Sequence, residues 1–265
     1  MCGRYVVVSK ISEIEERFGV HALEPYNPNF NIGPGSFAPV ITDKEPDKLQ
    51  FFQFGMTPFW AKKKLYFFNA RAEGDHNKED DPNYHGAMGI ISKPAFRKAI
   101  RSQRCLVIAD AFIEGTTAKK LDEPFVVHLS KGQRPFAFAG IWDEWVDQET
   151  GEVVNSFAII TTTPNKLLQM LPHHRSPVIL PKGKEREWLN PDLALGEVTA
   201  MLRPYEANDM NAYPISTAIK NPRSNGVELL KPTGPAVATE KALVVEQELL
   251  LEGMGFTRAR SRPRD

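Results

Sequence analysis

The first eight residues read MCGRYVVV and place an apolar strand directly behind a small, reactive residue. Tyr5 to Val8 are aromatic and β-branched, a composition that predicts a buried strand. Such a strand would hold Cys2 at the mouth of a rigid sheet, because the chain end itself would no longer fray. The rest of the fold is therefore expected to be arranged around this stretch.

Cys2 becomes the N-terminal residue if the initiator methionine is removed, as is usual before a small second residue. It then carries an α-amine and a thiol, whose ordinary pKa values of about 8 and 8.5 leave part of each group nucleophilic at neutral pH. The amine can condense with an aldehyde to a Schiff base, and the thiol can then close a thiazolidine ring. Alternatively, the amine can act as general base for an N-terminal nucleophile. Taken alone, a small residue at position 2 more often has no catalytic role.

Behind this opening, short strands alternate irregularly with short helices. The strongest strand patterns cover residues 104–114 and 156–163, and helices are predicted over 11–18, with Ser9 as N-cap, and over 92–102. An irregular order of this kind favours an α+β fold over a doubly wound sheet. The sequence predicts a single β-rich domain, with a mixed or barrel-like sheet core and short peripheral helices.

The character of the chain changes after residue 235. Residues 1–235 are expected to form the main domain, which carries the candidate functional residues. Residues 236–265 combine a helical pattern with a basic end, and they predict a C-terminal helix and a partly disordered tail.

Composition limits the class of protein. The 265 residues contain 33 Lys and Arg and 33 Asp and Glu, so a nucleic-acid site would have to be a local basic patch. Two cysteines and sparse, poorly spaced histidines give neither a disulfide framework nor a zinc site, and no phosphate-binding glycine loop is present. No apolar run approaches the roughly 20 residues that cross a membrane. A cytoplasmic monomer with no metal, cofactor or membrane partner is expected.

Several polar residues lie where predicted strands end. Asn69 and Glu114 follow apolar runs, and His173 or His174 follows a short helix, so these groups could converge with Cys2 in one pocket. Each also has a simpler interpretation: Asn69 as a turn residue, Glu114 as the ion-pair partner of a nearby lysine, and the histidines as part of a surface loop.

Trp60 precedes three consecutive lysines, Lys62 to Lys64. An aromatic side chain beside basic residues is typical of a surface that binds single-stranded nucleic acid by stacking and phosphate contacts. A solvated loop with one packed tryptophan is the simpler alternative.

Five short motifs together resemble one protein family. They are Cys2-Gly3-Arg4-Tyr5, Asn31 with Pro34, Asn69-Ala70-Arg71-x-Glu73, Ala109-Asp110-x-Phe112-x-Glu114 and His173-x-Arg175-x-Pro177. In this order they resemble the SRAP family, the SOS-response-associated peptidase-like, abasic-site processing proteins. The resemblance covers roughly residues 2 to 232.

The resemblance implies a DNA-repair activity on single-stranded DNA that contains abasic sites. In such a protein, Cys2 captures the open-chain aldehyde of the abasic site as a thiazolidine DNA–protein crosslink. Asn69 would orient the N-terminus, and Glu114 would handle the amine proton and the Schiff-base step. His173 would act as general acid on the sugar ring oxygen during ring opening and during reversal of the crosslink.

The same resemblance implies a set of DNA contacts. Phosphates near the lesion would be held by Arg4, Arg71 and Arg175. The cleft would be bordered by Asn31, Pro34 and Trp60, and replication-associated proteins would be further partners.

This sequence departs from the family's pattern beside two of these residues. Ile113 and Gly115 flank Glu114 where aromatic residues are common, and His174 stands where an acidic residue or Asn is usual. Two other functions use the same residues. One is a cysteine amidohydrolase or self-processing peptidase that removes Met1, and the other is a non-catalytic single-strand binder.

Overall fold

Five strands close into a barrel because the last pairs with the first. The computed structural model describes residues 2–238. Around the barrel, in order of pairing, lie β4 (Phe37–Thr42), β7 (Arg104–Ala109), β10 (Phe136–Val146), β11 (Val153–Thr162) and β5 (Lys48–Phe54). Neighbouring strands run antiparallel except β5 and β11, which run parallel with Phe54 opposite Phe157. This single parallel contact closes the ring and makes the sheet mixed.

Aromatic side chains fill the barrel. Phe54 and Phe157 stack with ring centroids 5.2 Å apart, and Tyr5 meets the rings of Phe54 and Phe138 edge-on at 5.5 and 6.0 Å. Tyr5 is fully buried, so the strand behind Cys2 is fixed by the same core that holds the barrel together. The predicted anchoring of Cys2 by this strand is thus explained by the packing of one side chain.

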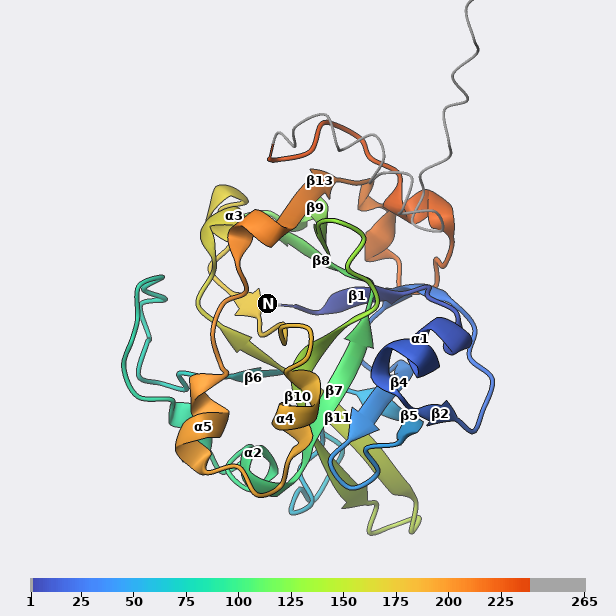
Figure 1. The fold of residues 1–265 in the computed structure, drawn as a ribbon, viewed down its shortest axis with the longest axis vertical. Helices are drawn as coiled ribbons and strands as arrows, with labels where there is room; N and C mark the ends of the chain where they lie inside the picture. The colour runs from blue at the N-terminus through green and yellow to red at the C-terminus, as the bar shows by residue number, and fades with distance from the viewer. Residues whose placement is uncertain (1, 239–265) are drawn as a thin grey trace, which may run out of the picture.

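A second, antiparallel sheet carries the start of the chain. Its strands follow the order β13 (Met210–Pro214), β9 (Lys120–Leu129), β8 (Ala111–Thr116), β1 (Arg4–Val7) and β3 (Asn29–Ile32). Figure 1 labels the first four of these strands in its upper half. The chain passes from β7 of the barrel into β8 through Asp110. The buried carboxylate of Asp110 accepts hydrogen bonds from the backbone nitrogens of Val8 and Ser9 and from the Ser9 hydroxyl. Asp110 therefore joins the two sheets.

The helices are short and peripheral. They are α1 (Ile11–Phe18), α2 (Ala99–Ser102), α3 (Lys166–Met170), α4 (Glu185–Leu189) and α5 (Leu195–Ala200), with 3-10 turns at 89–91, 207–209, 217–220 and 227–230. The prediction of Ser9 as N-cap is wrong, because its hydroxyl binds Asp110 and the helix starts after Lys10, whose backbone nitrogen donates to the Glu13 carboxylate. The helix predicted over 92–102 is regular only over its last turn.

The remaining strands are β2 (His21–Ala22), β6 (Asn69–Arg71) and β12 (Ser176–Pro177). The predicted fold class is confirmed: one domain with a mixed, barrel-like sheet and few short helices. The domain boundary near residue 235 stays a prediction, and the predicted C-terminal helix and tail lie outside the described residues from 239 onward. Within residues 2–238, no helix has the length and apolar character needed to span a membrane.

Candidate active site

Strand pairing places Cys2 beside Glu114. Arg4 lies opposite Ile113 in the antiparallel pair of β1 and β8, so the same register continued brings Gly3 opposite Glu114. A cavity of about 840 Å³ opens here. Its lining includes Gly3, Arg4, Pro34, Glu114 and His173. The structure thus brings several of the predicted site residues to one cavity.

The Cys2 thiol is enclosed by the protein. The residue is fully buried, and burial, followed by the charge of Glu114, raises the pKa of the thiol well above its usual value. Its backbone carbonyl accepts a 2.9 Å hydrogen bond from Nδ2 of Asn69. Asn69 reaches this position because β6 pairs in parallel with β11, with Asn69 opposite Ile159. The predicted role of Asn69 in orienting the N-terminus has this contact in its favour and stays a prediction.

Glu114 and His173 form a buried pair. Oε2 of Glu114 lies 3.2 Å from Nε2 of His173, while Nδ1 of His173 lies 2.7 Å from the carbonyl oxygen of Arg175. A carbonyl oxygen only accepts, so Nδ1 carries a proton, and Nε2 has its lone pair toward Glu114 when the ring is neutral.

Burial decides where the proton of this pair resides. It raises the pKa of Glu114 to about 7 and lowers the pKa of His173 to about 4. Near neutral pH the carboxyl group therefore carries much of the shared proton, and the imidazole is neutral. The role of general acid expected of His173 stays a prediction, and in this geometry the proton of the pair lies on Glu114 rather than on the imidazole.

Arg4 is positioned by Asn31. Nη1 of Arg4 donates to Oδ1 of Asn31 at 2.6 Å, and Nη2 donates to the carbonyl of Lys220 at 3.1 Å. The Asn31 amide nitrogen donates in turn to carbonyls of the segment 219–224, and only 4% of the residue is exposed. The structure places Asn31 behind Arg4 rather than on an open surface, whereas Pro34 lines the cavity directly.

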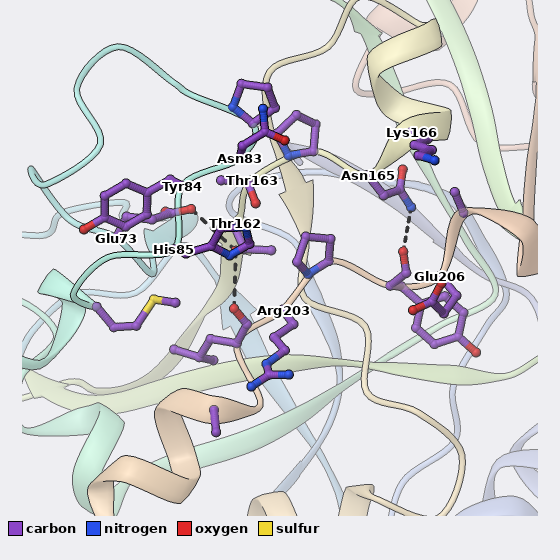
Figure 2. Close-up of a pocket in the computed structure, with 18 of the residues that line it drawn as sticks. Glu73, Asn83, Tyr84, His85, Thr162, Thr163, Asn165, Lys166, Arg203 and Glu206 are labelled. Atoms are coloured by element: carbon purple, nitrogen blue, oxygen red, sulfur yellow. Dashed lines mark hydrogen bonds between the residues drawn. The ribbon is translucent and has the colours of Figure 1, made fainter.

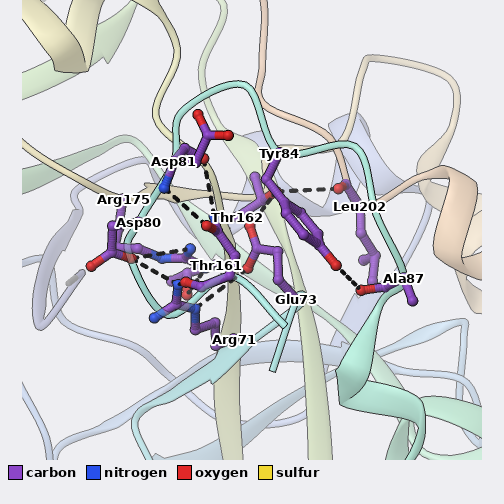
Figure 3. Close-up of polar contacts among 11 residues, drawn as sticks. Arg71, Glu73, Asp80, Asp81, Tyr84, Ala87, Thr161, Thr162, Arg175 and Leu202 are labelled. Atoms are coloured by element: carbon purple, nitrogen blue, oxygen red, sulfur yellow. Dashed lines mark hydrogen bonds and ion pairs between the residues drawn. The ribbon is translucent and has the colours of Figure 1, made fainter. Parts of the chain in front are cut away.

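Arg71 and Arg175 lie in a cluster of ion pairs (Figure 3), and neither residue lines the cavity beside Glu114. Nη2 of Arg175 is 2.7 Å from Oε2 of Glu73, and Nη2 of Arg71 is 2.8 Å from Oδ1 of Asp80. Arg175 is 2% exposed and Glu73 is 1% exposed. Both arginines, predicted to hold phosphates, are thus held by carboxylates of the protein itself.

Sequence reasoning gave no role to Glu73 or Asp80. Glu73 belongs to the motif that contains Arg71, and a carboxylate two residues from an arginine was the available signal. Asp80 lies in a polar loop without periodicity, and no signal separates it from its acidic neighbours.

Trp60 lies on a separate surface. It is 49% exposed and forms a shallow hollow with Phe59, Pro94, Arg97 and Lys98, away from the residues that line the cavity beside Glu114. Nζ of Lys98 sits 4.1 Å from the Phe59 ring centroid. The basic residues that line this hollow are Arg97 and Lys98, and the nucleic-acid surface predicted from Trp60 and Lys62 to Lys64 stays a prediction.

A second large cavity, of about 940 Å³, has Glu73 among its lining residues (Figure 2). Loop residues 82–86 form one wall, and the ends of β11 and α3 form another. Among residues 2–238, no group of three or more His, Cys, Asp and Glu side chains is arranged to hold a metal ion.

Comparison with known families assigns the chain. A family model described as SOS response associated peptidase (SRAP) matches residues 1–222. The chain belongs to the SRAP family. The resemblance seen in the five motifs is confirmed by this match.

Similar SRAP proteins carry a common name. The abasic site processing protein YoqW of Bacillus subtilis (strain 168) is 35% identical over 243 residues, covering 87% of this chain and 99% of YoqW. The abasic site processing protein HMCES of Xenopus tropicalis is 25% identical over 259 residues, covering 84% of this chain and 73% of HMCES. A crystal structure of a protein from Bacteroides thetaiotaomicron superposes with a TM-score of 0.71 at 28% identity, covering 84% of this chain and 97% of that one.

The two departures of this SRAP chain beside Glu114 have structural reasons. Ile113 packs into an apolar cluster with Val6 and Val126, on the side of β8 away from the barrel. A Cβ on Gly115 would lie 1.7 Å from the carbonyl oxygen of Lys120, where β8 and β9 approach across an irregular register. Glycine is required here because the partner backbone occupies the space of any side chain.

Proposed function

We propose that this protein processes abasic sites by forming a covalent thiazolidine crosslink between Cys2 and the lesion in single-stranded DNA. The observation that carries the proposal is the burial of Cys2 beside the Glu114–His173 pair, whose shared proton titrates near neutral pH. The names of the similar proteins give abasic sites as their substrate and support the same substrate here.

The first step requires an amine and an aldehyde. After removal of Met1, the Cys2 amine attacks the aldehyde carbon, which the abasic sugar exposes once its ring oxygen has been protonated and the ring has opened. The Glu114 carboxylate takes a proton from the amine and returns it to the departing hydroxyl, so that one water leaves and a Schiff base forms. The buried Oδ1 of Asn69 has no hydrogen-bond partner within residues 2–238, so it is available to accept from the amine.

The second step closes the ring. The Cys2 sulfur bonds to the imine carbon, and the thiol proton passes to the imine nitrogen, so no further group leaves. A thiol that keeps its proton at neutral pH suits this order, because it does not compete with the amine for the aldehyde. The raised thiol pKa of Cys2 therefore favours amine attack first and sulfur addition second.

The DNA contacts follow from the local charges. Arg4 lines the cavity, and the partly exposed Arg71 with the buried Arg175 supplies two further guanidinium groups for phosphates that flank the lesion. Net charge is zero over the chain, and a local clamp of this kind needs no global excess of positive charge.

The test separates a thiazolidine from a Schiff base. Protein freed of Met1, checked by intact mass, is incubated with an abasic single-stranded oligonucleotide and analysed on a denaturing gel with and without borohydride. The wild type should give a heat-stable adduct without borohydride, and its mass should equal protein plus oligonucleotide minus one water. Cys2→Ala keeps the amine and loses the sulfur, so it should give an adduct only with borohydride.

Cys105→Ala is the matched control, because Cys105 is the only other cysteine and is also fully buried. This variant should crosslink like the wild type. Absence of any wild-type adduct, or an adduct that survives heat in Cys2→Ala without borohydride, would refute the proposal.

A second candidate function is supported by the family's description as a peptidase. In this alternative, Cys2 cleaves an amide bond, first of all the bond that follows Met1. The raised pKa of the Cys2 thiol disfavours the thiolate that such a reaction uses. Self-processing would show as intact-mass loss of Met1 in purified wild type that His173→Ala does not undergo, with no aminopeptidase added.

A further inference from the structure

The loop between β6 and the 3-10 turn at 89–91 contacts the two arginines of the cluster. We call residues 74–88 the strap; in Figure 1 it extends from β6 on the left of the view. Arg71 Nη2 donates to the carbonyl oxygen of Asn77 and pairs with Oδ1 of Asp80 at 2.8 Å. The same Asp80 oxygen lies 4.0 Å from Nη1 of Arg175. One carboxylate of the strap thus faces both guanidinium groups (Figure 3).

We propose that Asp80 occupies the position of a DNA phosphate and thereby weakens binding of undamaged single-stranded DNA. The proposal rests on the proposed function, in which Arg71 and Arg175 contact phosphates. Asp80 is then a specificity-determining residue, because it competes with DNA phosphates for the two arginines. A DNA strand contacts both arginines only when it displaces Asp80.

The charge balance of the cluster supports this role. Arg71 and Arg175 carry two positive charges, and Glu73 with Asp80 supplies two negative ones. Glu73 is buried at the base of the cluster, with its Oε2 2.7 Å from Arg175, so it keeps the guanidinium groups in place when the strap moves. Removal of Asp80 alone leaves one net positive charge in the cluster, and Arg71, whose side chain is 31% exposed, can present that charge to a phosphate.

Asp80 is built to be displaced. Its side chain is 30% exposed, whereas that of Glu73 is 1% exposed, so Asp80 is the carboxylate of the cluster that an approaching phosphate can reach. Its backbone has φ of 54°, in the left-handed region that only Gly, Asn and Asp adopt at low cost. The next limb of the strap, residues 82–86, walls the 940 Å³ cavity of Figure 2. If the strap moved away from the arginines, this cavity and the arginine cluster would form one continuous surface that DNA could contact.

The competition gives selectivity because only the lesion reacts. A covalent product accumulates even when the first encounter is weak, since each capture is retained. Undamaged strands make no covalent bond, so weaker phosphate binding shortens their occupancy directly. Asp80 would therefore reduce the yield of crosslinked abasic DNA only slightly. It would also lower the fraction of protein occupied by undamaged DNA when that DNA is in excess.

The test compares Asp80→Asn with Glu79→Gln. Both remove one negative charge from adjacent positions of the strap, but Glu79 is exposed and has no ion pair with either arginine. Asparagine tolerates the left-handed backbone of position 80, so the fold is preserved, and equal melting temperatures check this. Binding of each protein to an undamaged fluorescent oligonucleotide is measured by anisotropy. In parallel, crosslinking of an abasic oligonucleotide is timed against increasing undamaged competitor.

Asp80→Asn should bind the undamaged strand about threefold to fivefold more tightly than wild type, the scale of one partly exposed ion pair. Its crosslinking should be inhibited by correspondingly less competitor, and Glu79→Gln should behave as wild type. Equal affinities for the two variants, or Asp80→Asn binding no tighter than wild type, would overturn the role of Asp80. These outcomes are separate from the proposed function, whose failure is the absence of any adduct with the abasic strand alone.

Discussion

At the scale of single residues, the proposed reaction of Cys2 depends on where one proton resides. Glu114 and His173 are both buried, and burial acts on them in opposite directions, because it disfavours the charged form of each. The pKa of Glu114 at about 7 lets the carboxyl group both take and return a proton near neutral pH. A pair with pKa values shifted in this way suits the formation of the Schiff base, which begins with attack of an amine and ends with loss of water.

A pH profile tests this assignment. The rate of crosslinking should rise with pH through about 7, because the carboxylate that accepts the amine proton forms over this range. Glu114→Gln cannot exchange a proton, so its rate at pH 7.5 should fall about a hundredfold, and the midpoint near 7 should vanish. The measurement is the single-turnover crosslinking rate from pH 5.5 to 8.5. Glu144→Gln, an exposed carboxylate on β10, should keep the wild-type profile. If Glu114→Gln keeps that midpoint, Glu114 is not the titrating base.

At the scale of elements, the position of Glu114 depends on the close approach of β8 and β9. Gly115→Ala should destabilise the protein by roughly 2 kcal/mol or more and displace the adjacent Glu114, because its Cβ would lie 1.7 Å from the Lys120 carbonyl oxygen. Urea unfolding and crosslinking rate measure the two effects. Both should be impaired together, since one strand carries both residues.

Gly196→Ala is the matched control for this substitution. Gly196 lies in α5, and a Cβ there meets no atom within 4 Å. Alanine is the better helix former, so this variant should be as stable as wild type or more stable by up to about 1 kcal/mol. Equal stability of the two alanine variants would show that the strands can separate at Gly115 without cost.

The strands and helices also show how much of the fold could be predicted from the sequence. The strands over residues 104–109 and 156–162 could be predicted because each is a compact apolar run with β-branched residues. The closure of the barrel could not, because the parallel contact of Phe54 with Phe157 joins segments that lie far apart in the chain. Ser9 satisfies the local rule for an N-cap, but Asp110, about a hundred positions away, takes its hydroxyl. Local patterns thus predict single strands and helices, whereas strand pairing and side-chain contacts depend on residues that lie far apart in the chain.

The site residues follow the same division. Cys2, Asn69, Glu114 and His173 could be predicted as site residues because their motifs occur in a recognisable order. In the structure Glu114 and His173 line one cavity, and Asn69 donates to the backbone carbonyl of Cys2. The pairing of Arg71 with Asp80 had no sequence signal, because an ion pair depends on the fold of a loop without periodicity.

At the scale of the whole molecule, the active site reduces the stability of the fold that holds it. The barrel and the second sheet leave only 3% of Glu114 exposed, and its pKa rises from 4.5 to about 7 on folding. A carboxyl group whose pKa is raised in the folded state stabilises that state at low pH and loses this contribution as pH rises toward 7. His173, with its pKa lowered from 6.5 to about 4, acts in the opposite direction, and its contribution is lost as pH falls through that range.

The comparison of wild type with Glu114→Gln isolates the carboxyl contribution, because His173 is common to both proteins. Glutamine has nearly the same shape and can donate to Nε2 of His173, as the protonated carboxyl does, but it never becomes charged. Between pH 5 and pH 8 the stability of Glu114→Gln relative to wild type should therefore increase by roughly 2 kcal/mol, or several degrees in melting temperature. Urea and thermal unfolding at the two pH values measure this double difference, with the exposed Glu144→Gln expected to show none. If Glu114→Gln is inactive yet more stable than wild type at pH 8, the buried carboxyl group is retained for chemistry. If the stability difference between the two proteins is the same at both pH values, or changes in the other direction, Glu114 is already ionised at low pH and cannot supply the proton.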